Sequence, residues 1–330
     1  MKVFKFGGAS VKTAADVKNV AAILKKYAGQ KILIVISAMG KTTNALEKVV
    51  TAFYAGNKDE ALLLFEDIKE EHVSIYNQLI SEEYKSSLKN EQPLADFFTE
   101  IEWLLHDKPV RQYDYYYDQI VCVGELLSTA IVSHYLLNEG IKNRWIDVRD
   151  ILRTDANFRD ATVDWAVTSE KVAGYITPLF QTFDFVLTQG FIGATDENQS
   201  TTLGREGSDY SAALFANILQ AESQTIWKDV EGVMNADPKE YSKAQLIKNL
   251  NYKEVVEMAY YGAQVIHPKT IKPLQNKGIP LYVRSFLHPE KEGTEIHNKG
   301  VSNLPPIIVY KKDQVLLQLG SKDFSFVVKV

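Results

Sequence analysis

The sequence predicts an α/β fold built around an open, mainly parallel sheet. A short apolar strand at Val3–Phe6 is followed by a helical pattern and then by the apolar, partly β-branched run Ile32–Ile36. This strand–helix–strand order is typical of a βαβ unit, whose two strands lie parallel in one sheet. The same alternation returns in the second half of the chain, and the sequence shows no internal repeat and no low-complexity segment.

The first elements follow from local patterns. Thr13 and Asp16 form a capping-box-like pair, with Asp in place of the usual Glu or Gln, so a helix is expected to begin there. Apolar residues then recur at helical spacing from Val17 to Tyr27. Ile32–Ile36 is apolar at every position, which is typical of a strand that is buried on both faces of a parallel sheet.

Residues 45 to about 137 are expected to be mostly helical, because apolar residues recur there at three- and four-residue spacing. They would form a helical insertion in the N-terminal half, and the cluster Tyr113–Tyr117 is interpreted as an amphipathic surface or interface. Further strands are predicted at Arg144–Val148, Asp184–Thr188, Thr225–Trp227, Pro280–Val283, Ile307–Tyr310 and Gln314–Leu319. Further helices are predicted at 164–181, 208–220, 253–261 and 268–277.

Composition limits the class of protein. The chain has 37 basic and 42 acidic residues, a net charge of -5, which argues against a general nucleic-acid binder. Cys122 is the single cysteine, which excludes an intrachain disulfide and fits a reducing cytoplasm. We see no signal-peptide pattern and no apolar run near the roughly 20 residues of a membrane span, so no membrane partner is expected.

The segment Lys5–Ser10 ends the first strand and contains Gly7 and Gly8. Glycines let backbone amides approach an anion, and a lysine supplies a compact positive charge beside them. The alternative is an ordinary Gly-Gly turn with an exposed lysine. The segment is neither a Walker A loop, because the lysine precedes the glycines, nor the Gly-x-Gly-x-x-Gly fingerprint of dinucleotide folds.

Two polar segments follow in the first half. Ser37–Asn44 comes directly after the second strand, where parallel sheets bind ligands, although it could equally be an N-cap cluster. Gly124 and Glu125 open a helix predicted to run to residue 137. Glu125 is either a residue that the helix dipole favours or an anchor for a ligand ammonium.

The most informative segments lie later. A strand ending in glycines, Thr188–Gly193, is followed by a polar hairpin and by the Gly-rich turn within Thr201–Asp209. Arg205 offers a planar fork for a carboxylate, and the helix expected to start at about Ser208 offers backbone amides. Two further polar turns are Trp227–Lys239 and Gly262–Pro268.

These six segments, in this order and at these spacings, resemble the aspartate kinases of the amino acid kinase family, from residue 2 to about residue 296. The resemblance implies a carbamate-kinase-like three-layer αβα sandwich over residues 1–300, with an aspartate site at about 1–200 and a nucleotide site at about 201–300. It implies transfer of the γ-phosphoryl group of ATP to the side-chain carboxylate of L-aspartate. The product would be 4-phospho-L-aspartate, the first step of lysine, threonine and methionine biosynthesis.

The resemblance also implies roles. Lys5 would neutralise the transferring phosphoryl group, Gly7 and Gly8 would present amides, and Asp209 would orient Lys5 or help to hold Mg²⁺ through water. Mg²⁺ would rest mainly on the ATP phosphates and water, with no direct protein ligand. An ionised carboxylate needs no general base, so catalysis would consist of positioning and charge neutralisation.

For the aspartate, Arg205 would bind the α-carboxylate and Glu125 the ammonium. The rest of the pocket would be lined by Ser37, Thr43, Phe191 and Ser208. The ATP site would be made by Lys5, Gly7, Gly8, Ser10, Lys228, Asp229, Met234, Lys239, Gly262 and Gln264.

Four positions depart from the usual motifs of the family. Ala9 replaces Thr, Lys239 replaces Arg, and Gln264 replaces a Lys near the nucleotide. Glu206 stands where a second Gly is usual, and it would place negative charge near an anion site unless its side chain points away.

Other readings stay open. A different kinase of the same fold would keep the Gly-Gly start, but it is not expected to combine Gln-Gly-Phe with Gly-Arg-x-Gly-Ser-Asp. A non-catalytic sensor of amino acid and nucleotide would bind both ligands without turnover; the presence of Lys5 and Asp209 argues against it. A nicotinamide dehydrogenase is disfavoured by the missing glycine fingerprint.

Residues 301–330 are expected to be a linker and the incomplete start of an ACT-type regulatory domain. Family members usually carry a pair of such modules, and a stub this short cannot bury its own sheet face. We therefore expect that lysine and threonine do not shift the aspartate saturation curve of this chain. A homodimer is expected to be weakened by the missing region.

Overall fold

The computed structural model describes residues 1–330 except 89–91, 264–265, 301–303, 310–314 and 316–330. In this described part, eight strands form one sheet in the order β3-β4-β2-β1-β7-β9-β10-β8. Neighbouring strands run parallel, except that β10 is antiparallel to β9. The strands are β1 (Lys2–Phe6), β2 (Ile32–Ile36), β3 (Asn143–Trp145), β4 (Phe185–Gln189), β7 (Ser223–Lys228), β8 (Asn249–Asn251), β9 (Leu281–Ser285) and β10 (Thr294–His297). The predicted α/β fold with a mainly parallel sheet is confirmed.

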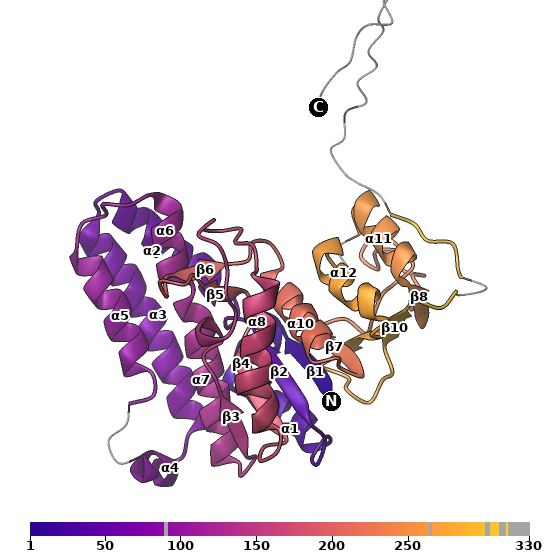
Figure 1. Cartoon of the computed structure of the whole chain (residues 1–330), viewed down its shortest axis with the longest axis horizontal. Helices are drawn as coiled ribbons and strands as arrows, with labels where there is room; N and C mark the ends of the chain where they lie inside the picture. The colour runs from indigo at the N-terminus through magenta and orange to yellow at the C-terminus, as the bar shows by residue number, and fades with distance from the viewer. Residues whose placement is uncertain (89–91, 264–265, 301–303, 310–314, 316–330) are drawn as a thin grey trace, which may run out of the picture.

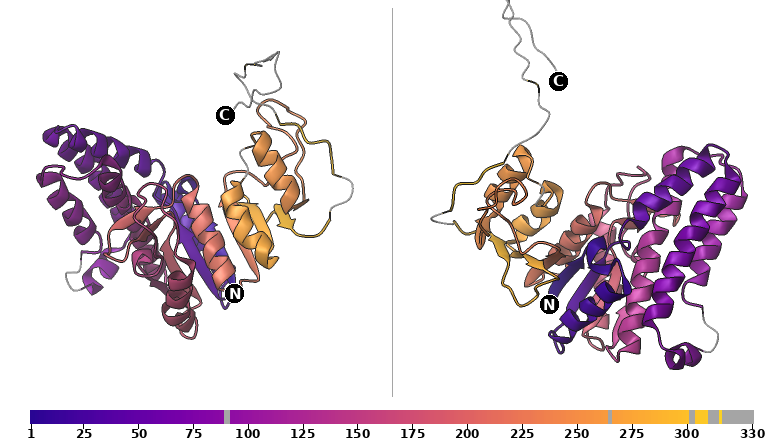
Figure 2. Two further views of the ribbon diagram at one scale, coloured as in Figure 1. Left: turned by 45° about the horizontal axis from the view of Figure 1, so that its top comes forward. Right: turned by 180° about the vertical axis from the view of Figure 1, so that it is seen from behind.

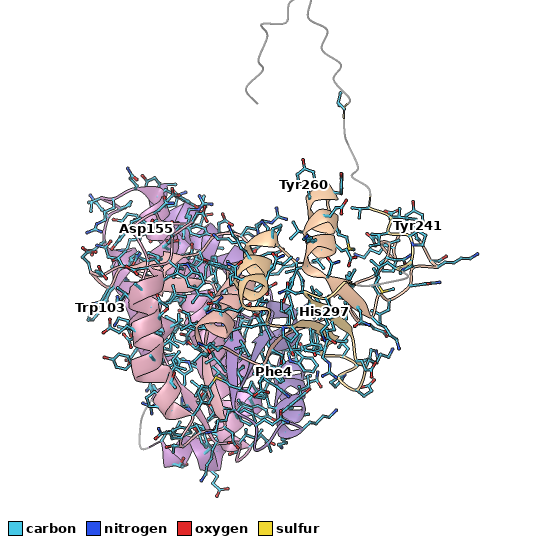
Figure 3. The ribbon with its side chains drawn as sticks, turned by 45° about the vertical axis from the view of Figure 1, so that its right-hand side comes forward. Phe4, Trp103, Asp155, Tyr241, Tyr260 and His297 are labelled. Carbon is cyan, nitrogen blue, oxygen red and sulfur yellow. The ribbon has the colours of Figure 1, made fainter. Side chains whose placement is uncertain are left out.

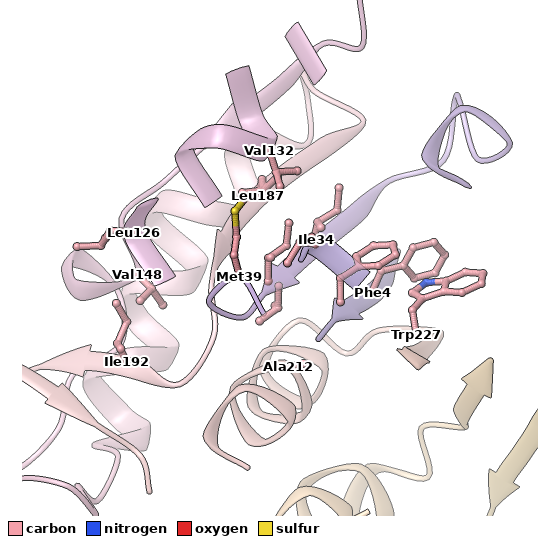
Figure 4. Close-up of a cluster of buried hydrophobic side chains, with 14 of the residues drawn as sticks. Phe4, Ile34, Met39, Leu126, Val132, Val148, Leu187, Ile192, Ala212 and Trp227 are labelled. Carbon is pink, nitrogen blue, oxygen red and sulfur yellow. The ribbon is translucent and has the colours of Figure 1, made fainter. Parts of the chain in front are cut away.

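Helices cover both faces of this sheet (Figure 1). On one side α7 packs on β2, β3 and β4, and on the other side α10 packs on β1, β2 and β7. Figure 4 shows buried side chains of α7, α10 and the strands between them as one continuous cluster. The longer helices are α1 (Ala14–Lys25), α2 (Thr42–Tyr54), α3 (Lys58–Leu79), α5 (Ala95–His106), α6 (Tyr113–Val121), α7 (Val123–Asn138), α10 (Gly207–Ile218), α11 (Tyr252–Tyr261) and α12 (Pro268–Lys277). The three-layer αβα arrangement is therefore confirmed.

The start of α1 matches its sequence pattern. Asp16 N donates to Thr13 Oγ1 at 3.2 Å, and Thr13 N donates to Asp16 Oδ2 at 3.0 Å. This reciprocal pair satisfies two amides at the helix start that have no intrahelical partner. Asp thus serves in the capping box as Glu would.

Aromatic side chains in the core pack β1 against β7. Phe6 stacks on Trp227 with ring centroids 5.9 Å apart, and Phe4 meets the same indole edge-on at 5.7 Å. All three side chains are fully buried. Because successive side chains of a strand point to opposite faces, Lys5 lies on the other face of β1 from these rings, where it meets Asp209 of α10.

Helices α2, α3, α5 and α6, with the short α4 (Glu82–Ser87), form the predicted helical insertion. They lie on the side of the molecule away from α11, α12, β8 and β10 (Figures 1 and 2). Together α6 and α7, as Tyr113–Asn138, are long and apolar enough to cross a membrane, contrary to the sequence expectation. Because 89% of the tested stretch is buried inside the fold, it has the character of a core helix.

Several sequence expectations need correction. Arg144–Val148 is not one strand: β3 ends at Trp145, and Val148 begins a 3-10 turn whose amide donates to Gln189 Oε1. In the C-terminal segment, residues 307–309 are not a strand, while Tyr310 and most of Gln314–Leu319 lie outside the described residues. The short strands β8 and β10 were missed because their sequences are largely polar. The helix predicted at 164–181 is divided into three successive helical elements, which are α8 (Trp165–Lys171), a π-helical turn at Val172–Ile176 and α9 (Thr177–Leu179).

Candidate active site

A cavity of about 430 Å³ lies at the carboxyl ends of β1, β2 and β4. These strands are neighbours and parallel, so the segments that follow them meet at one edge of the sheet. Among its lining residues are eight that the sequence singled out: Lys5, Ser37, Thr43, Glu125, Phe191, Arg205, Ser208 and Asp209. The structure therefore gathers the predicted substrate residues and the two predicted catalytic side chains around one space.

Lys5 and Asp209 form a close ion pair in this cavity. Lys5 Nζ lies 2.6 Å from Asp209 Oδ1, and the two side chains are 11% and 6% exposed. Lys5 comes from the end of β1, and Asp209 from the first turn of α10. A buried lysine held by one carboxylate presents a fixed positive charge, which suits the neutralisation of a transferring anionic group.

Gly8 brings two loops together through backbone contact. A Cβ on Gly8 would lie 2.7 Å from Ala38 O and 2.9 Å from Gly40 O, so a larger residue does not fit. Gly40 N donates to Gly8 O at 3.0 Å. The loop after β1 is thereby held against the loop after β2, which carries Ser37. Ser10 is buried, and its hydroxyl donates to Gly7 O at 2.6 Å, so it stabilises the loop from within.

Glu125 is a buried carboxylate with an unused oxygen. It is 2% exposed, Ala38 N donates to its Oε1 at 3.4 Å, and Oε2 has no hydrogen-bond partner in the part of the chain that the structure describes. Burial raises the pKa of Glu125 to about 8. An unpaired buried carboxylate that lines a cavity is suited to receive a ligand cation.

The raised pKa of Glu125 predicts a pH-dependent stability. Between about pH 4.5 and pH 8 the unfolded chain ionises Glu125 while the folded chain keeps the proton, so the folded state binds more protons. This term lowers the free energy of unfolding as the pH rises, by about 1.4 kcal/mol for each pKa unit of the shift at most. Glu125→Gln should remove the decline. Urea unfolding of both proteins from pH 5 to pH 8.5 measures it, and parallel curves would contradict the assignment.

The loop that carries Arg205 is shaped by left-handed residues. Gly204 has φ 73° and Glu206 has φ 54°, and they flank Arg205 directly. Arg205 is exposed, lines the cavity, and has no hydrogen bond or ion pair with any residue that the structure describes. Its guanidinium is therefore available for a ligand carboxylate.

The glycines of this region allow α10 to approach the loop after β4. A Cβ on Gly207 would lie 2.6 Å from Phe191 Cδ2, and one on Gly190 would lie 2.7 Å from Ser208 Cβ. Phe191 N donates to Ser211 Oγ at 3.0 Å. The same contacts place Phe191 beside the first turn of α10, so Phe191 and Ser208 reach the cavity together.

Sequence reasoning missed Tyr117 and Arg159, which also line the cavity. The Arg159 guanidinium lies 4.4 Å from the centre of the Tyr117 ring and 3.2 Å from Asp114 Oδ1. The cluster Tyr113–Tyr117 is thus partly a wall of this site. Arg159 has φ 69°, and no motif marked it.

Asp118 ties that wall to the hairpin formed by β5 (Ile192–Ala194) and β6 (Ser200–Thr202). It is fully buried and accepts from Arg159 N at 3.0 Å, from Thr202 N at 2.9 Å and from Thr202 Oγ1 at 2.7 Å. Burial raises the pKa of Asp118 to about 6 despite these donors. The buried carboxylate fixes the positions of Arg159 and Thr202 at the cavity.

Six of the ten predicted nucleotide residues lie at the end of β7 or after it. Lys228 ends β7, and Asp229 is exposed in the next turn. Met234 is half-buried, Lys239 is exposed, and Gly262 ends α11 with φ 112°. None of them lines the cavity described above, and Gln264 lies outside the described residues. Their role stays a prediction.

No group of three or more His, Cys, Asp or Glu side chains gathers as a metal site in the described part of the chain. Asp209 is the carboxylate nearest to Lys5, and it is already paired with that lysine. A divalent cation would fit here as an ion held mostly by phosphate oxygens and water, because Mg²⁺ commonly keeps several waters.

Comparison with known proteins gives one family. The sequence profile of the amino acid kinase family matches residues 1–285. The lysine-sensitive aspartokinase 3 of Escherichia coli is 34% identical over 324 residues, which cover 97% of this chain and 69% of that protein. The aspartokinase of Chlamydia trachomatis is 33% identical, over 89% of this chain and 64% of its own length.

Among solved structures, E. coli aspartokinase III in complex with aspartate and ADP superposes with a TM-score of 0.81 at 32% identity. The match covers 92% of this chain and 65% of that one. The chain thus spans about two thirds of these bacterial relatives. It spans 32% of the bifunctional aspartokinase/homoserine dehydrogenase 1 of Arabidopsis thaliana, at 31% identity.

Proposed function

The chain belongs to the amino acid kinase family, among its aspartokinases, and we propose that it phosphorylates the side-chain carboxylate of L-aspartate with ATP. The products are ADP and 4-phospho-L-aspartate. The observation that carries this proposal is the cavity itself. It presents the unpaired guanidinium of Arg205, the buried carboxylate of Glu125 and the fixed ammonium of Lys5. These groups are complementary to the α-carboxylate of aspartate, to its ammonium and to the transferred phosphoryl group, in that order.

The charges of the cavity suggest one orientation for bound aspartate. Its α-carboxylate would lie on Arg205, and its ammonium on Glu125, whose Oε2 lacks a partner. The side-chain carboxylate then points toward Lys5. Ser37, Thr43, Phe191 and Ser208 complete the walls. Binding of the ammonium requires ionised Glu125, so aspartate should displace the proton that burial keeps on this carboxyl at neutral pH.

The chemical step is a single displacement at phosphorus. An oxygen of the side-chain carboxylate forms a bond to the γ-phosphorus of ATP, and the bond from that phosphorus to the β,γ-bridging oxygen breaks. The electron pair of that bond leaves with ADP. The nucleophile is already ionised at pH 7, so no proton has to move. Lys5 neutralises charge on the transferring group, and Asp209 holds Lys5 in place.

We assign the nucleotide to the loops that follow β1, β7 and α11. Gly7 and Gly8 would offer backbone amides to the phosphates, while Lys228, Asp229, Met234, Lys239 and Gly262 would surround the ribose and adenine. Mg²⁺ bound to the phosphates would supply charge neutralisation for the leaving group. We further propose that the protein is cytoplasmic, since its single cysteine fits a reducing compartment, and that it forms a homodimer.

A panel of acceptors tests the function. ADP release is measured with aspartate, glutamate and N-acetylglutamate at equal concentrations. We expect release with aspartate to exceed release with the other two at least about tenfold, because a longer or acetylated acceptor cannot place its carboxylate at Lys5 while its ammonium reaches Glu125. Equal rates would indicate another kinase of this fold. Binding of aspartate without ADP release would indicate a sensor.

Glu125→Gln should weaken aspartate binding more than succinate binding. Succinate has both carboxylates but no ammonium, so it gains nothing from a charge at position 125. We expect aspartate affinity to fall by roughly 10-fold or more, from the loss of one charge-assisted hydrogen bond, and succinate affinity to stay the same or rise. Calorimetric titration of both ligands measures the difference. Equal losses would mean that Glu125 has a structural role alone.

A further inference from the structure

The loop that carries Arg205 is attached to α12 at two points. His267 N, at the start of α12, donates to Glu206 Oε2 at 2.8 Å. Lys269 Nζ, two residues further on, donates to Leu203 O at 2.9 Å. The two attachments lie on either side of Arg205 in the sequence. Between them Arg205 has no partner of its own among the residues described, so the backbone of the loop sets the direction of its side chain.

The Lys269 attachment is itself well fixed. Its ammonium also pairs with Asp160 Oδ1 at 3.0 Å and lies 5.2 Å from the centre of the Tyr210 ring. Asp160 Oδ1 in turn would lie 2.7 Å from a Cβ on Gly204. The loop is therefore in contact with Asp160 on one side, while Lys269 joins Asp160, the loop carbonyl and α10.

Glu206 holds a conformation that a glycine adopts more easily. Its φ of 54° lies in the left-handed region, where a residue with a Cβ is strained. The Glu206 carboxylate accepts from the amide at the start of α12, where the helix dipole favours a negative charge. This interaction offsets part of the backbone strain. The negative charge of Glu206 is thus held at the start of α12 by the amide of His267.

We propose that Glu206 and Lys269 are positioning residues, which hold the loop Leu203–Glu206 so that Arg205 points into the aspartate cavity. The contact links the substrate site to the part of the chain that follows β8. This inference rests on the proposed function, and it adds two residues that act through Arg205, of which Glu206 also lines the cavity.

Glu206→Gly separates positioning from stability. Glycine relieves the backbone strain but removes the bond to His267 N. We expect the KM for aspartate to rise about 10-fold, kcat to change less than about 3-fold, and Tm to stay equal or increase, because a clamp on the non-reacting carboxylate acts on binding alone. Glu206→Gln keeps an acceptor oxygen and should restore the KM to within about 3-fold of the wild type.

Gln220→Gly is the matched control. Gln220 has φ 50° at the end of α10, so glycine relieves the same kind of strain there, away from the cavity. We expect a similar Tm and an unchanged KM. An unchanged KM in Glu206→Gly, or an equal rise in Glu206→Gln, overturns the positioning role.

Calorimetric Kd values for aspartate separate this inference from the function on which it rests. Wild-type protein that binds aspartate but releases no ADP refutes the transfer reaction, while a weaker Kd in Glu206→Gly still supports the positioning role. Active wild type with an unaltered Glu206→Gly Kd refutes the positioning role alone. Absence of aspartate binding to the wild type refutes both.

Discussion

Lys5→Ala is expected to lower kcat by roughly 10²-fold or more and to leave the KM for aspartate nearly unchanged. The ammonium lies in the cavity within an ion pair of 2.6 Å. In the proposed reaction it would face the group being transferred rather than the α-carboxylate or the ammonium of the substrate. Its charge therefore acts mainly on the transition state, and removal of such a contact lowers turnover rather than ground-state affinity. Steady-state kinetics with aspartate varied at saturating ATP measure both constants.

Lys5→Met removes the same charge with less loss of side-chain volume, and it should also reduce stability, because it leaves Asp209 as an unpaired, nearly buried carboxylate. Breaking a buried pair by removing one partner costs about 3–5 kcal/mol, whereas removing both charges costs less. The double variant Lys5→Met/Asp209→Asn should therefore be more stable than Lys5→Met, although both should lack activity. If folded Lys5→Met keeps its turnover and loses affinity for aspartate instead, the role assigned to Lys5 is wrong.

Arg205→Lys should raise the KM for aspartate by roughly 10- to 100-fold, with a small effect on kcat. A lysine keeps the positive charge but cannot make two parallel hydrogen bonds to one carboxylate, and each charge-assisted bond is worth about 1.5–3 kcal/mol. Arg205 is exposed and has no partner in the described part of the chain, so the substitution should not change Tm. This separates it from Lys5, whose loss affects turnover and stability together.

Arg159→Lys is the matched control for Arg205→Lys, because Arg159 lines the same cavity but is already paired with Asp114 and stacked on Tyr117. A larger KM effect at Arg159 than at Arg205 would show that the carboxylate clamp has been assigned to the wrong guanidinium.

The sequence predicted the sheet well because its strands carry strong local signals. Ile32–Ile36 is apolar at every position, and all five residues are buried in β2. The site residues on the loops after β1, β2 and β4 were predictable for a topological reason, since parallel neighbouring strands end at one edge. The short strands β8 and β10 have no such local signal. They are defined by their pairing in the sheet, because β10 pairs with β9 and β8 pairs with β10.

Arg159 and Glu206 show where local patterns fail. Both have positive φ, and both act through partners distant in the sequence: Asp118 and Asp114 for Arg159, and His267 for Glu206. The sequence marked Glu206 as a misplaced negative charge. The structure gives that charge a partner 61 positions away, which no periodicity or motif could indicate.

Trapping of the product with hydroxylamine tests the central claim most directly. An acyl phosphate formed on the side-chain carboxylate reacts with hydroxylamine to give the side-chain hydroxamate of aspartate and free phosphate. The side-chain and α-hydroxamates have the same mass, and fragmentation in tandem mass spectrometry distinguishes them. We predict side-chain hydroxamate in an amount equal to the ADP released, and its loss in Lys5→Met. ADP release without any hydroxamate, or hydroxamate on the α-carboxylate, would contradict the proposed reaction.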